Sequence, residues 1–493
     1  MTLHGNTRRA LIAICFAILG AIYAIAWFTP AVGLYHDDGV YLVTAKALAA
    51  GHGYTIESLP HAIPQTKYPP LFPALLALFL LVSQQTQWLK LLPLLCAAGW
   101  LAVTFRLLRK MGATANGALV LIFLTAISPT VVFLSTSLMS EPLFALLGAA
   151  SLLMLLEDRP WTAGALAGLA TLTRTAGVPL IVACILTLAI RRRFAGALKF
   201  CATAMLLAAP WFGWSIARAP RDPYYGAGNY VSLNILTSLP ANEKLIVFAR
   251  NFLWLWISPT ELLTGFTSIY ALIATLLIFG WCLYVRRQLL PDLFVGLYCL
   301  MLLCWAWPPQ RFVVPVLPLV LWMAWRVITR VRIQEAVAAA VLIIAGAGLW
   351  SDGIRVPGAL SAGALSPEPQ PADDWHEMKR LFSYIRANTP ATSILVGNLD
   401  PVLFLNTGRK AVRGFAPNAF GLLYAERQQG ITPDQVSGAI LREQADYVVV
   451  TPDRDFVEAP SFHSSVQALE RGGRLQPVPI PGLSPDYRLL RVQ

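Results

Sequence analysis

The sequence predicts an α-helical polytopic membrane protein with about eleven transmembrane helices, followed by a small C-terminal α/β domain. Of the 493 residues, 56% are hydrophobic and 13% are charged, and the mean hydropathy is +0.59. Soluble domains carry about 25% charged residues, so this deficit, together with repeated apolar runs of about 18 residues or more, places the chain in lipid. After residue 371, helical segments alternate with short β-rich runs, which is typical of a small α/β domain.

The net charge of +12 does not indicate a nucleic-acid partner. The basic residues stand mostly in short clusters between apolar runs, as they do in the cytoplasmic loops of membrane proteins, and no basic domain is present. All seven cysteines fall inside apolar segments, which excludes a disulfide framework and zinc-ligand spacing.

The positive-inside rule gives the expected orientation. The basic clusters expected in the cytoplasm are Arg8/Arg9, Arg106/Arg109/Lys110, Arg191 to Arg193, Arg286/Arg287 and Arg326/Arg330/Arg332. The spans that fit between them are residues 10–29, 88–107, 117–137, 142–156, 160–177, 178–190, 197–216, 265–285, 292–307, 312–327 and 333–350. The N-terminus is then cytoplasmic, and an odd number of spans puts everything after Trp350 outside the cytoplasm. We therefore expect a multi-pass protein of the bacterial inner membrane with a periplasmic C-terminal domain.

Two apolar segments near the N-terminus need separate interpretation. Leu11 to Phe28 resembles a signal peptide, but it is long enough to span and lacks a small-residue cleavage site, so it is expected to be an uncleaved first helix. Pro70 to Val82 is only about thirteen residues long, which is too short to span. It is expected to lie as an interfacial helix on the outer leaflet.

The predicted domains are a membrane domain over residues 1–350, a linker over 351–371 and an extracytoplasmic α/β domain over 372–493. The first outer loop, residues 30–82, carries the candidate site, and a second outer loop runs from Arg218 to about Gly265. Prolines from Pro357 to Pro371 indicate the linker. The expected elements beyond it are a helix from Asp373 to Asn388, a strand from Ser393 to Gly397, a helix from Thr432 to Gln444 and a strand from Tyr447 to Val450.

Three acidic residues lie at the expected outer face. Asp37 and Asp38 follow the first span, and Glu141 precedes Pro142 at the outer end of the third span. Carboxylates at a membrane face are costly unless they are solvated, paired or used. Helix capping accounts for these acids with no catalytic role, because an acidic residue in the first turn of a helix is favourable. A catalytic role is the other explanation, and the residues alone leave both explanations open.

Three basic residues accompany these acids. Lys67 lies in the first outer loop, while Arg174 and Arg311 lie at outer helix ends and break the positive-inside pattern. Snorkelling is one explanation, and a functional role is the other. Two of these acids, Asp37 and Glu141, with three bases around one cavity suit an anionic lipid-linked substrate and a hydroxyl nucleophile. The histidines of the first loop, His36, His52 and His61, show no ligand spacing and are expected at the loop surface.

With these residues the chain resembles the GT-C class of membrane glycosyltransferases, and more narrowly its branch of protein O-mannosyltransferases, aminoarabinose transferases and Rgt-like enzymes. The resemblance covers most of the first 330 residues, and its short motifs occur in family order. They are Asp37-Asp38 three residues before Tyr41, Lys67-Tyr68-Pro69-Pro70, Ser140-Glu141-Pro142, Thr173-Arg174, Pro210-Trp211, and Arg311-Phe312 with Pro315 and Pro318.

The resemblance implies transfer of a sugar from a polyprenyl phosphate to an acceptor hydroxyl outside the cytoplasm. It implies that Asp37 is the base and Glu141 a second acid, and that Lys67 and Arg174 contact the lipid phosphate. The other residues that it implies in substrate binding are Asp38, Tyr41, Tyr68 and Arg311. In aminoarabinose transferases the lysine directly precedes a proline, whereas Tyr68 intervenes here. Arg174 replaces a lysine of that branch, keeping the charge and adding a fork geometry that suits phosphate.

The sequence leaves several points open. A divalent cation between Asp37, Asp38 and Glu141 is an alternative to direct base catalysis. A transporter or flippase of a lipid-linked or anionic substrate is the alternative function, although no internal repeat typical of transporters is found. The acceptor is a glycolipid, a polysaccharide or a protein, and the sugar cannot be read because pocket shape decides it.

Overall fold

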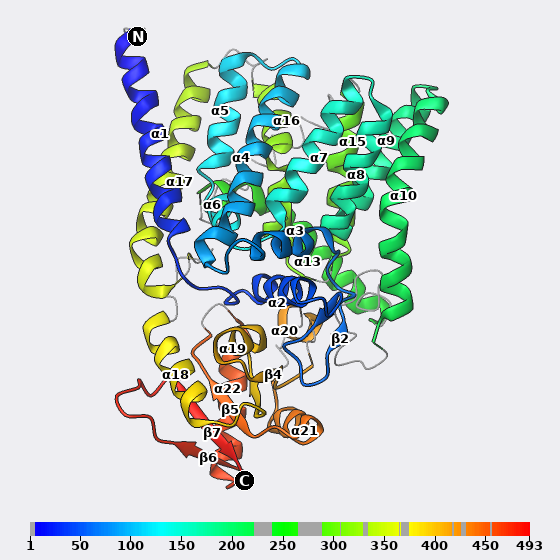
Figure 1. Ribbon diagram of the computed structural model, residues 1–493. Helices are drawn as coiled ribbons and strands as arrows, with labels where there is room; N and C mark the ends of the chain where they lie inside the picture. The colour runs from blue at the N-terminus through cyan, green and yellow to red at the C-terminus, as the bar shows by residue number, and fades with distance from the viewer. Residues whose placement is uncertain are drawn as a thin grey trace.

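The computed structural model describes residues 5–220, 239–264, 288–305, 307–328, 334–363, 365, 374–416, 419–424, 430–453 and 456–493. Within them, a bundle of helices carries an α/β unit at one end (Figure 1). The N-terminus lies at the opposite end of the bundle from this unit (Figure 1).

The bundle contains these elements in chain order: α1 (Gly5–Trp27), α2 (Asp37–Ala49), α3 (Leu71–Leu80), α4 (Thr86–Lys110), α5 (Ala115–Ala126), α6 (Pro129–Thr136), α7 (Glu141–Leu156), α8 (Pro160–Thr173), η1 (Thr175–Gly177), α9 (Val178–Ile190), α10 (Phe194–Arg218), α13 (Ala241–Thr264), α15 (Leu289–Leu303), η3 (Gln310–Val316), α16 (Leu317–Ile328) and α17 (Gln334–Ala362). Helices α2 and α3 lie across the end of the bundle that faces the α/β unit (Figure 1).

Helices occupy the predicted spans that fall on described residues, but four of them differ in shape or length. Helix α15 ends at Leu303, inside the span predicted over 292–307, and the span predicted over 312–327 begins in the 3-10 helix η3. The span predicted over residues 117–137 is broken into α5 and α6, which are bent by 68°. Ser128 caps α6 by accepting a hydrogen bond from Val131 N, and Pro129 begins the new helix, so the break has a local cause. The span predicted over 160–177 ends early, because Arg174 leaves the helix with φ −147° and ψ 134°.

By length and composition, two helices in the described ranges can cross a membrane, Thr86–Lys110 and Phe194–Arg218. A third is added if the bent pair α5–α6 is one span. Several further apolar helices have 10–17 residues, among them Glu141–Leu156 and Leu289–Leu303. The count of about eleven spans therefore stays a prediction, and the span expected over residues 265–285 lies outside the described residues. Helix α3 forms where the short apolar run predicts it, while its position in the outer leaflet stays a prediction.

Two predictions about connecting segments are wrong. The second outer loop was expected to continue to about Gly265, but residues 241–264 form helix α13, which packs on η3 and α17. Its apolar residues, such as Leu245 and Phe252, are interspersed with charged ones, namely Glu243, Lys244 and Arg250. These charges lower the mean hydropathy of the segment, so the helix is not recognised from hydropathy. The linker was expected from residue 351, but α17 continues to Ala362 with Pro357 inside it. Residues 366–373 of that linker lie outside the described part of the chain.

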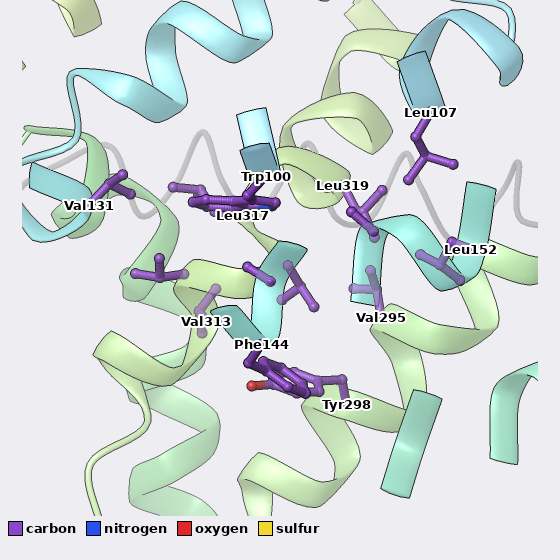
Figure 2. Packing of buried hydrophobic residues seen from close by; sticks show 14 of the residues in the cluster. Trp100, Leu107, Val131, Phe144, Leu152, Val295, Tyr298, Val313, Leu317 and Leu319 are labelled. Atoms are coloured by element: carbon purple, nitrogen blue, oxygen red, sulfur yellow. The ribbon is translucent and has the colours of Figure 1, made fainter. Parts of the chain in front are cut away.

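The bundle is held by one extended apolar core. Figure 2 shows Trp100 of α4 and Leu317 among the buried residues of this core, and Phe144 of α7 beside Tyr298 of α15. The Phe144 and Tyr298 rings stack with centroids 6.2 Å apart, and the Tyr298 hydroxyl donates to the Phe312 carbonyl at 2.9 Å. This packing fixes η3, and with it Arg311, relative to α7.

The α/β unit contains α18 (Trp375–Asn388), β3 (Ile394–Gly397), α19 (Asp400–Thr407), β4 (Lys410–Arg413), α20 (Ala419–Leu423), α21 (Pro433–Glu443), β5 (Tyr447–Val450), α22 (Ala459–Arg471), β6 (Leu475–Val478) and β7 (Arg488–Val492). The four predicted helices and strands of this region are confirmed to within two residues at each end. The five-stranded sheet has the order β4-β3-β5-β7-β6. Strand β3 pairs in parallel with β4 and β5, and the remaining pairs are antiparallel.

The first outer loop packs into this α/β unit. Ala31 and Leu34 belong to the apolar cluster on one side of the sheet, and Leu59 belongs to the cluster on the other side. The loop also contains a two-stranded pair, β1 (Thr55–Ile56) with β2 (Ile63–Pro64), and the Ser58 carbonyl next to it accepts a hydrogen bond from Ala411 N at 2.8 Å. The loop that carries the candidate acids is therefore clamped between the bundle and the sheet.

Candidate active site

Asp37 is the first residue of α2 and lies where two other elements reach it. The Tyr68 hydroxyl of the first outer loop and the Arg311 guanidinium of η3 both donate to its carboxylate. The Asp37 side chain remains 15% exposed. The Asp37 carboxylate is therefore oriented by a phenol, paired with a cation and still in contact with solvent.

Glu141 is the first residue of α7 and is paired with Arg174. The Glu141 side chain is 1% exposed, and its Oε1 lies 3.0 Å from Arg174 Nη1. The same Arg174 nitrogen donates to Ser140 Oγ at 2.9 Å, and the Tyr41 hydroxyl shares a hydrogen bond of 2.9 Å with that oxygen. Because α8 ends at Thr173, the extended backbone at Arg174 lets its side chain reach across to α7.

Arg311 joins the two acids. In addition to its contact with Asp37, its Nε lies 3.9 Å from Glu141 Oε1. Both guanidiniums lie near the Phe312 ring. Arg311 Cζ is 5.0 Å from the ring centroid, and Arg174 Cζ is 5.3 Å from it. Two cations thus lie near one aromatic ring, and their repulsion is offset by Glu141, which is near both, and by Asp37, which pairs with Arg311.

Lys67 approaches the same place from the first outer loop. Its ammonium lies 4.8 Å from the centroid of the Tyr68 ring, and the Tyr68 hydroxyl contacts Asp37. The loop is anchored on α10, because Trp214 donates to the Gln65 carbonyl at 3.0 Å and Ser215 to the Thr66 carbonyl at 2.8 Å. Lys67 is held near the acids by these backbone contacts.

Asp38 faces away from this cluster. Its carboxylate accepts hydrogen bonds from Gly33 N at 2.6 Å and Tyr35 N at 3.1 Å, and the residue is 3% exposed. It closes the turn before α2, in which His36 has a φ of 63° that non-glycine residues rarely adopt. The structural explanation therefore holds for Asp38. Asp37, in contrast, is partly exposed and paired with a cation, as a functional role would require.

Burial and these ion pairs together shift the pKa values of ionisable residues in the loop. Burial opposes ionisation of Asp37, but the charges of Arg311 and Lys67 outweigh it and hold the pKa of Asp37 well below its usual range. Burial lowers the pKa of Lys67 to about 8, although Asp37 opposes the shift. Burial raises the pKa of Asp38 to about 6 against its backbone hydrogen bonds. At neutral pH the site therefore holds an ionised Asp37 beside a protonated Lys67.

A shared metal ion is not indicated by the arrangement of these acids. In the ranges that the structure describes, no three His, Cys, Asp or Glu side chains are grouped to hold one ion. Asp37 and Glu141 each face an arginine, and Asp38 is bound to backbone amides. A divalent cation between the three acids stays an untested prediction.

The sequence missed the residues that meet the loop from the α/β unit. His36, expected at the loop surface, lies with Nε2 3.3 Å from Asp400 Oδ1, and Arg413 Nε lies 3.5 Å from the same oxygen. Burial and the nearby Arg413 lower the pKa of His36. Nothing in the sequence links the loop to residues so far along the chain. The expectation for the other two histidines is confirmed for His61, which is exposed, and for His52, whose side chain is 61% exposed.

Solved structures share this architecture over nearly the whole chain. The crystal structure of ArnT from Cupriavidus metallidurans bound to undecaprenyl phosphate is similar with a TM-score of 0.61 and 13% identity, covering 99% of this chain and 98% of that one. The apo state of the same protein gives a TM-score of 0.57 and 12% identity with the same coverage. No curated protein sequence matches the chain.

The fold is that of GT-C class membrane glycosyltransferases. Residues 66–308 match the family model described as "Glycosyltransferase family 87". This match includes Lys67, Glu141 and Arg174 and covers about half of the chain, and the fold agrees with it. The resemblance stated from the sequence motifs is confirmed at the level of this class.

Proposed function

We propose that this protein transfers a sugar from a polyprenyl-phosphate donor to an acceptor hydroxyl, with inversion at the anomeric carbon. The observation that carries the proposal is the chain of contacts from Asp37 through Arg311 to Glu141 and Arg174. It combines an accessible carboxylate with two adjacent guanidiniums. Undecaprenyl phosphate in the similar ArnT structure is a lipid of the proposed donor type.

Asp37 is the proposed general base. The acceptor oxygen forms a bond to the anomeric carbon, the bond from that carbon to the phosphate oxygen breaks, and the hydroxyl proton passes to Asp37. The Tyr68 hydroxyl, which donates to Asp37, keeps the carboxylate oriented toward the acceptor. Attack from the side opposite the leaving phosphate gives inversion.

Arg174 and Arg311 are the proposed partners of the phosphate. The electron pair of the broken bond leaves with the polyprenyl phosphate, and fixed cations stabilise this charge where water is scarce. Lys67 supplies a third cation from the loop. When the phosphate takes part of the charge of Arg311, the Asp37 carboxylate loses some of the stabilisation that lowers its pKa, so donor binding strengthens the base.

The proposed location is the outer face of the bacterial inner membrane, with a cytoplasmic N-terminus and the C-terminal unit in the periplasm. The basic clusters between helices support the orientation by the positive-inside rule. The opposite ends occupied by the N-terminus and the sheet in Figure 1 agree with it. The acceptor then comes from the cell envelope, as a glycolipid, a polysaccharide or a protein.

A deletion strain tests the function. Its lipids and glycans are profiled by mass spectrometry, after complementation with the wild-type gene, with Asp37→Asn or with an empty vector. A glycosyltransferase predicts loss of one sugar from a glycoconjugate, restored by the wild type alone, with accumulation of the sugar-loaded polyprenyl phosphate. Accumulation of a complete lipid-linked substrate on the inner leaflet, with no sugar missing from any glycoconjugate made from it, would favour a flippase, whereas restoration by Asp37→Asn would remove Asp37 from the role of base.

A further inference from the structure

The sheet of the α/β unit has the topology in which ligands commonly bind at one edge. Strands β4, β3 and β5 are parallel, so their carboxyl ends share an edge. The chain passes from β3 to β4 on one side and returns to β5 on the other side, which makes a topological switch point beside β3. In open α/β sheets, ligands bind outside the carboxyl ends of the strands at such a point.

Polar side chains gather at this edge. Asn398 and Asp400 directly follow β3, and Arg413 is the last residue of β4. Asn398 is 1% exposed, and neither its amide nitrogen nor its oxygen has a hydrogen-bond partner in the described part of the chain. A buried amide left unpaired costs about 1–3 kcal/mol, so the position is expensive unless a ligand supplies the partners.

This edge also borders the catalytic loop. Asp400 contacts both His36, the neighbour of Asp37, and Arg413. A Cβ added to Gly39 would lie 2.6 Å from the Cβ of Pro401, the residue after Asp400. The charges of Asp400 and Arg413 reach Lys67, whose pKa they shift in opposite directions. The edge therefore packs directly against the loop segment that carries Asp37.

We propose that the carboxyl edge formed by Asn398, Asp400 and Arg413 binds the carbohydrate of the acceptor and delivers its hydroxyl to Asp37. The proposal rests on the proposed glycosyltransferase function and names the acceptor class for it. An amide, a carboxylate and a guanidinium are planar groups with paired donors or acceptors, and neighbouring sugar hydroxyls can satisfy both members of each pair. The Phe415 ring, 5.9 Å from the Arg413 guanidinium, adds an apolar surface next to them.

Binding by the full-length protein in lipid nanodiscs tests the proposal. The acceptor probe is the deacylated core oligosaccharide of lipopolysaccharide, the donor-side probe is undecaprenyl phosphate, and a serine-rich peptide is the competing acceptor probe. Asn398→Leu keeps the approximate shape and removes the unpaired amide, and Arg413→Gln removes the guanidinium. Each is expected to weaken oligosaccharide binding at least tenfold and to change undecaprenyl phosphate binding less than twofold.

The control is Asn388→Ala, which changes an exposed asparagine at the end of α18 in the same unit. It should change neither affinity. Asn398→Leu should leave the thermal midpoint equal or higher, because replacing an unpaired buried amide with an apolar group of similar shape is neutral or stabilising. A lower midpoint with unchanged oligosaccharide binding would mean a structural role and overturn the proposal.

Two other outcomes also overturn it. If the wild type binds the peptide and not the oligosaccharide, the acceptor is a protein and the carbohydrate assignment is wrong. Equal weakening of both ligands in Asn398→Leu would mean that the edge supports the whole site instead of one substrate. Failure of the wild type to bind undecaprenyl phosphate would instead count against the glycosyltransferase function, so the two failures can be told apart.

Discussion

The two sides of the candidate site are built in different ways. On the bundle side, Glu141, Arg174 and Arg311 come from the ends of apolar helices and are paired with one another. On the sheet side, His36 of the first outer loop meets Asp400 and Arg413 of a separate α/β unit. Charges in an apolar bundle stand out because lipid makes them expensive, whereas charges at the edge of a soluble sheet look ordinary. The first side can therefore be recognised in a sequence, and the second becomes visible only in the folded chain.

The bundle side and the sheet side can form one site only if both lie on the same face of the membrane. Alkaline phosphatase fused after Gln493 should be active and green fluorescent protein fused there should be dark, because the C-terminal unit is expected outside the cytoplasm. The effect is all or none. Fluorescence at this position would place the sheet in the cytoplasm and would mean that the number of spans differs by one.

Asp37 lies between the two sides, and its loss should have the largest effect on rate. Asp37→Asn should lower the turnover number by about 10²–10⁴-fold, because the amide cannot accept the proton. Asn is nearly isosteric and still caps a helix well, so membrane insertion and thermal stability should be preserved. Turnover is measured with purified protein at saturating donor.

Asp38→Asn is the matched control for this substitution. Asp38 is held by Gly33 N and Tyr35 N, so its loss should mainly loosen the turn and reduce turnover less than the change at Asp37. Equal losses at both positions would point to a cation shared by the pair. Near-normal turnover of Asp37→Asn would make Glu141 the leading candidate for the base.

On the bundle side, a substitution at Arg174 should change the affinity for the lipid donor and leave the affinity for the acceptor unchanged. Arg174→Gln should weaken undecaprenyl phosphate binding by about tenfold to a hundredfold, the range for one lost charged hydrogen bond, and Arg174→Lys should weaken it less. Arg159→Gln, at the exposed opposite end of α8, is the control. Unchanged donor binding in Arg174→Gln would leave snorkelling as the explanation for this arginine.

The contact between the two sides can be disturbed at one glycine. A Cβ on Gly39 would lie 2.6 Å from Pro401 Cβ and 2.9 Å from Gly33 Cα. Gly39→Ala should therefore cost about 1–3 kcal/mol, as overpacking does, and should expose the α/β unit to proteolysis. Gly20→Ala is the control, because a Cβ there meets nothing within 4 Å. Resistance to protease equal to that of the wild type would mean that the loop and the sheet do not depend on this contact.

The smallest expected effect is a pH dependence of donor binding through Lys67. Its pKa is lowered to about 8, so the ammonium is present below that pH and is lost as the pH rises through it. Undecaprenyl phosphate affinity should fall by about fivefold to tenfold above pH 8, corresponding to about 1–1.4 kcal/mol. Lys67→Arg should remove this step, since arginine stays protonated. A step that persists in Lys67→Arg would have another origin.

Sequence reasoning named most of the residues that the fold brings together on the bundle side, because their signals are local. Asp37, Tyr41, Tyr68, Glu141, Arg174 and Arg311 are joined by direct contacts, and Lys67 lies over Tyr68. Adjacent residues still behave differently, because Asp38 turns toward the backbone of the preceding turn. Helix α13 escaped prediction because charges interrupt its apolar residues. The bend between α5 and α6 was also missed, although Ser128 and Pro129 carry a local signal for it.

The sheet side could not be predicted for a different reason. The helices and strands of the α/β unit follow from local pattern, and four of them lie where the sequence predicts. Their packing against residues 31–59 depends on complementary surfaces that no periodicity records. The close fit of Gly33 and Gly39 against α19 becomes meaningful only when both partners are seen together.

The clamping of the first outer loop has a consequence for biosynthesis. Domains of a growing chain generally fold as units from the N-terminal end, yet Ala31, Leu34 and Leu59 find their apolar partners in strands and helices that are synthesised last. The apolar side chains of this early loop therefore stay uncovered until the C-terminal unit has been synthesised and folded. His36, the neighbour of Asp37, likewise acquires its contact with Asp400 only at the close of synthesis.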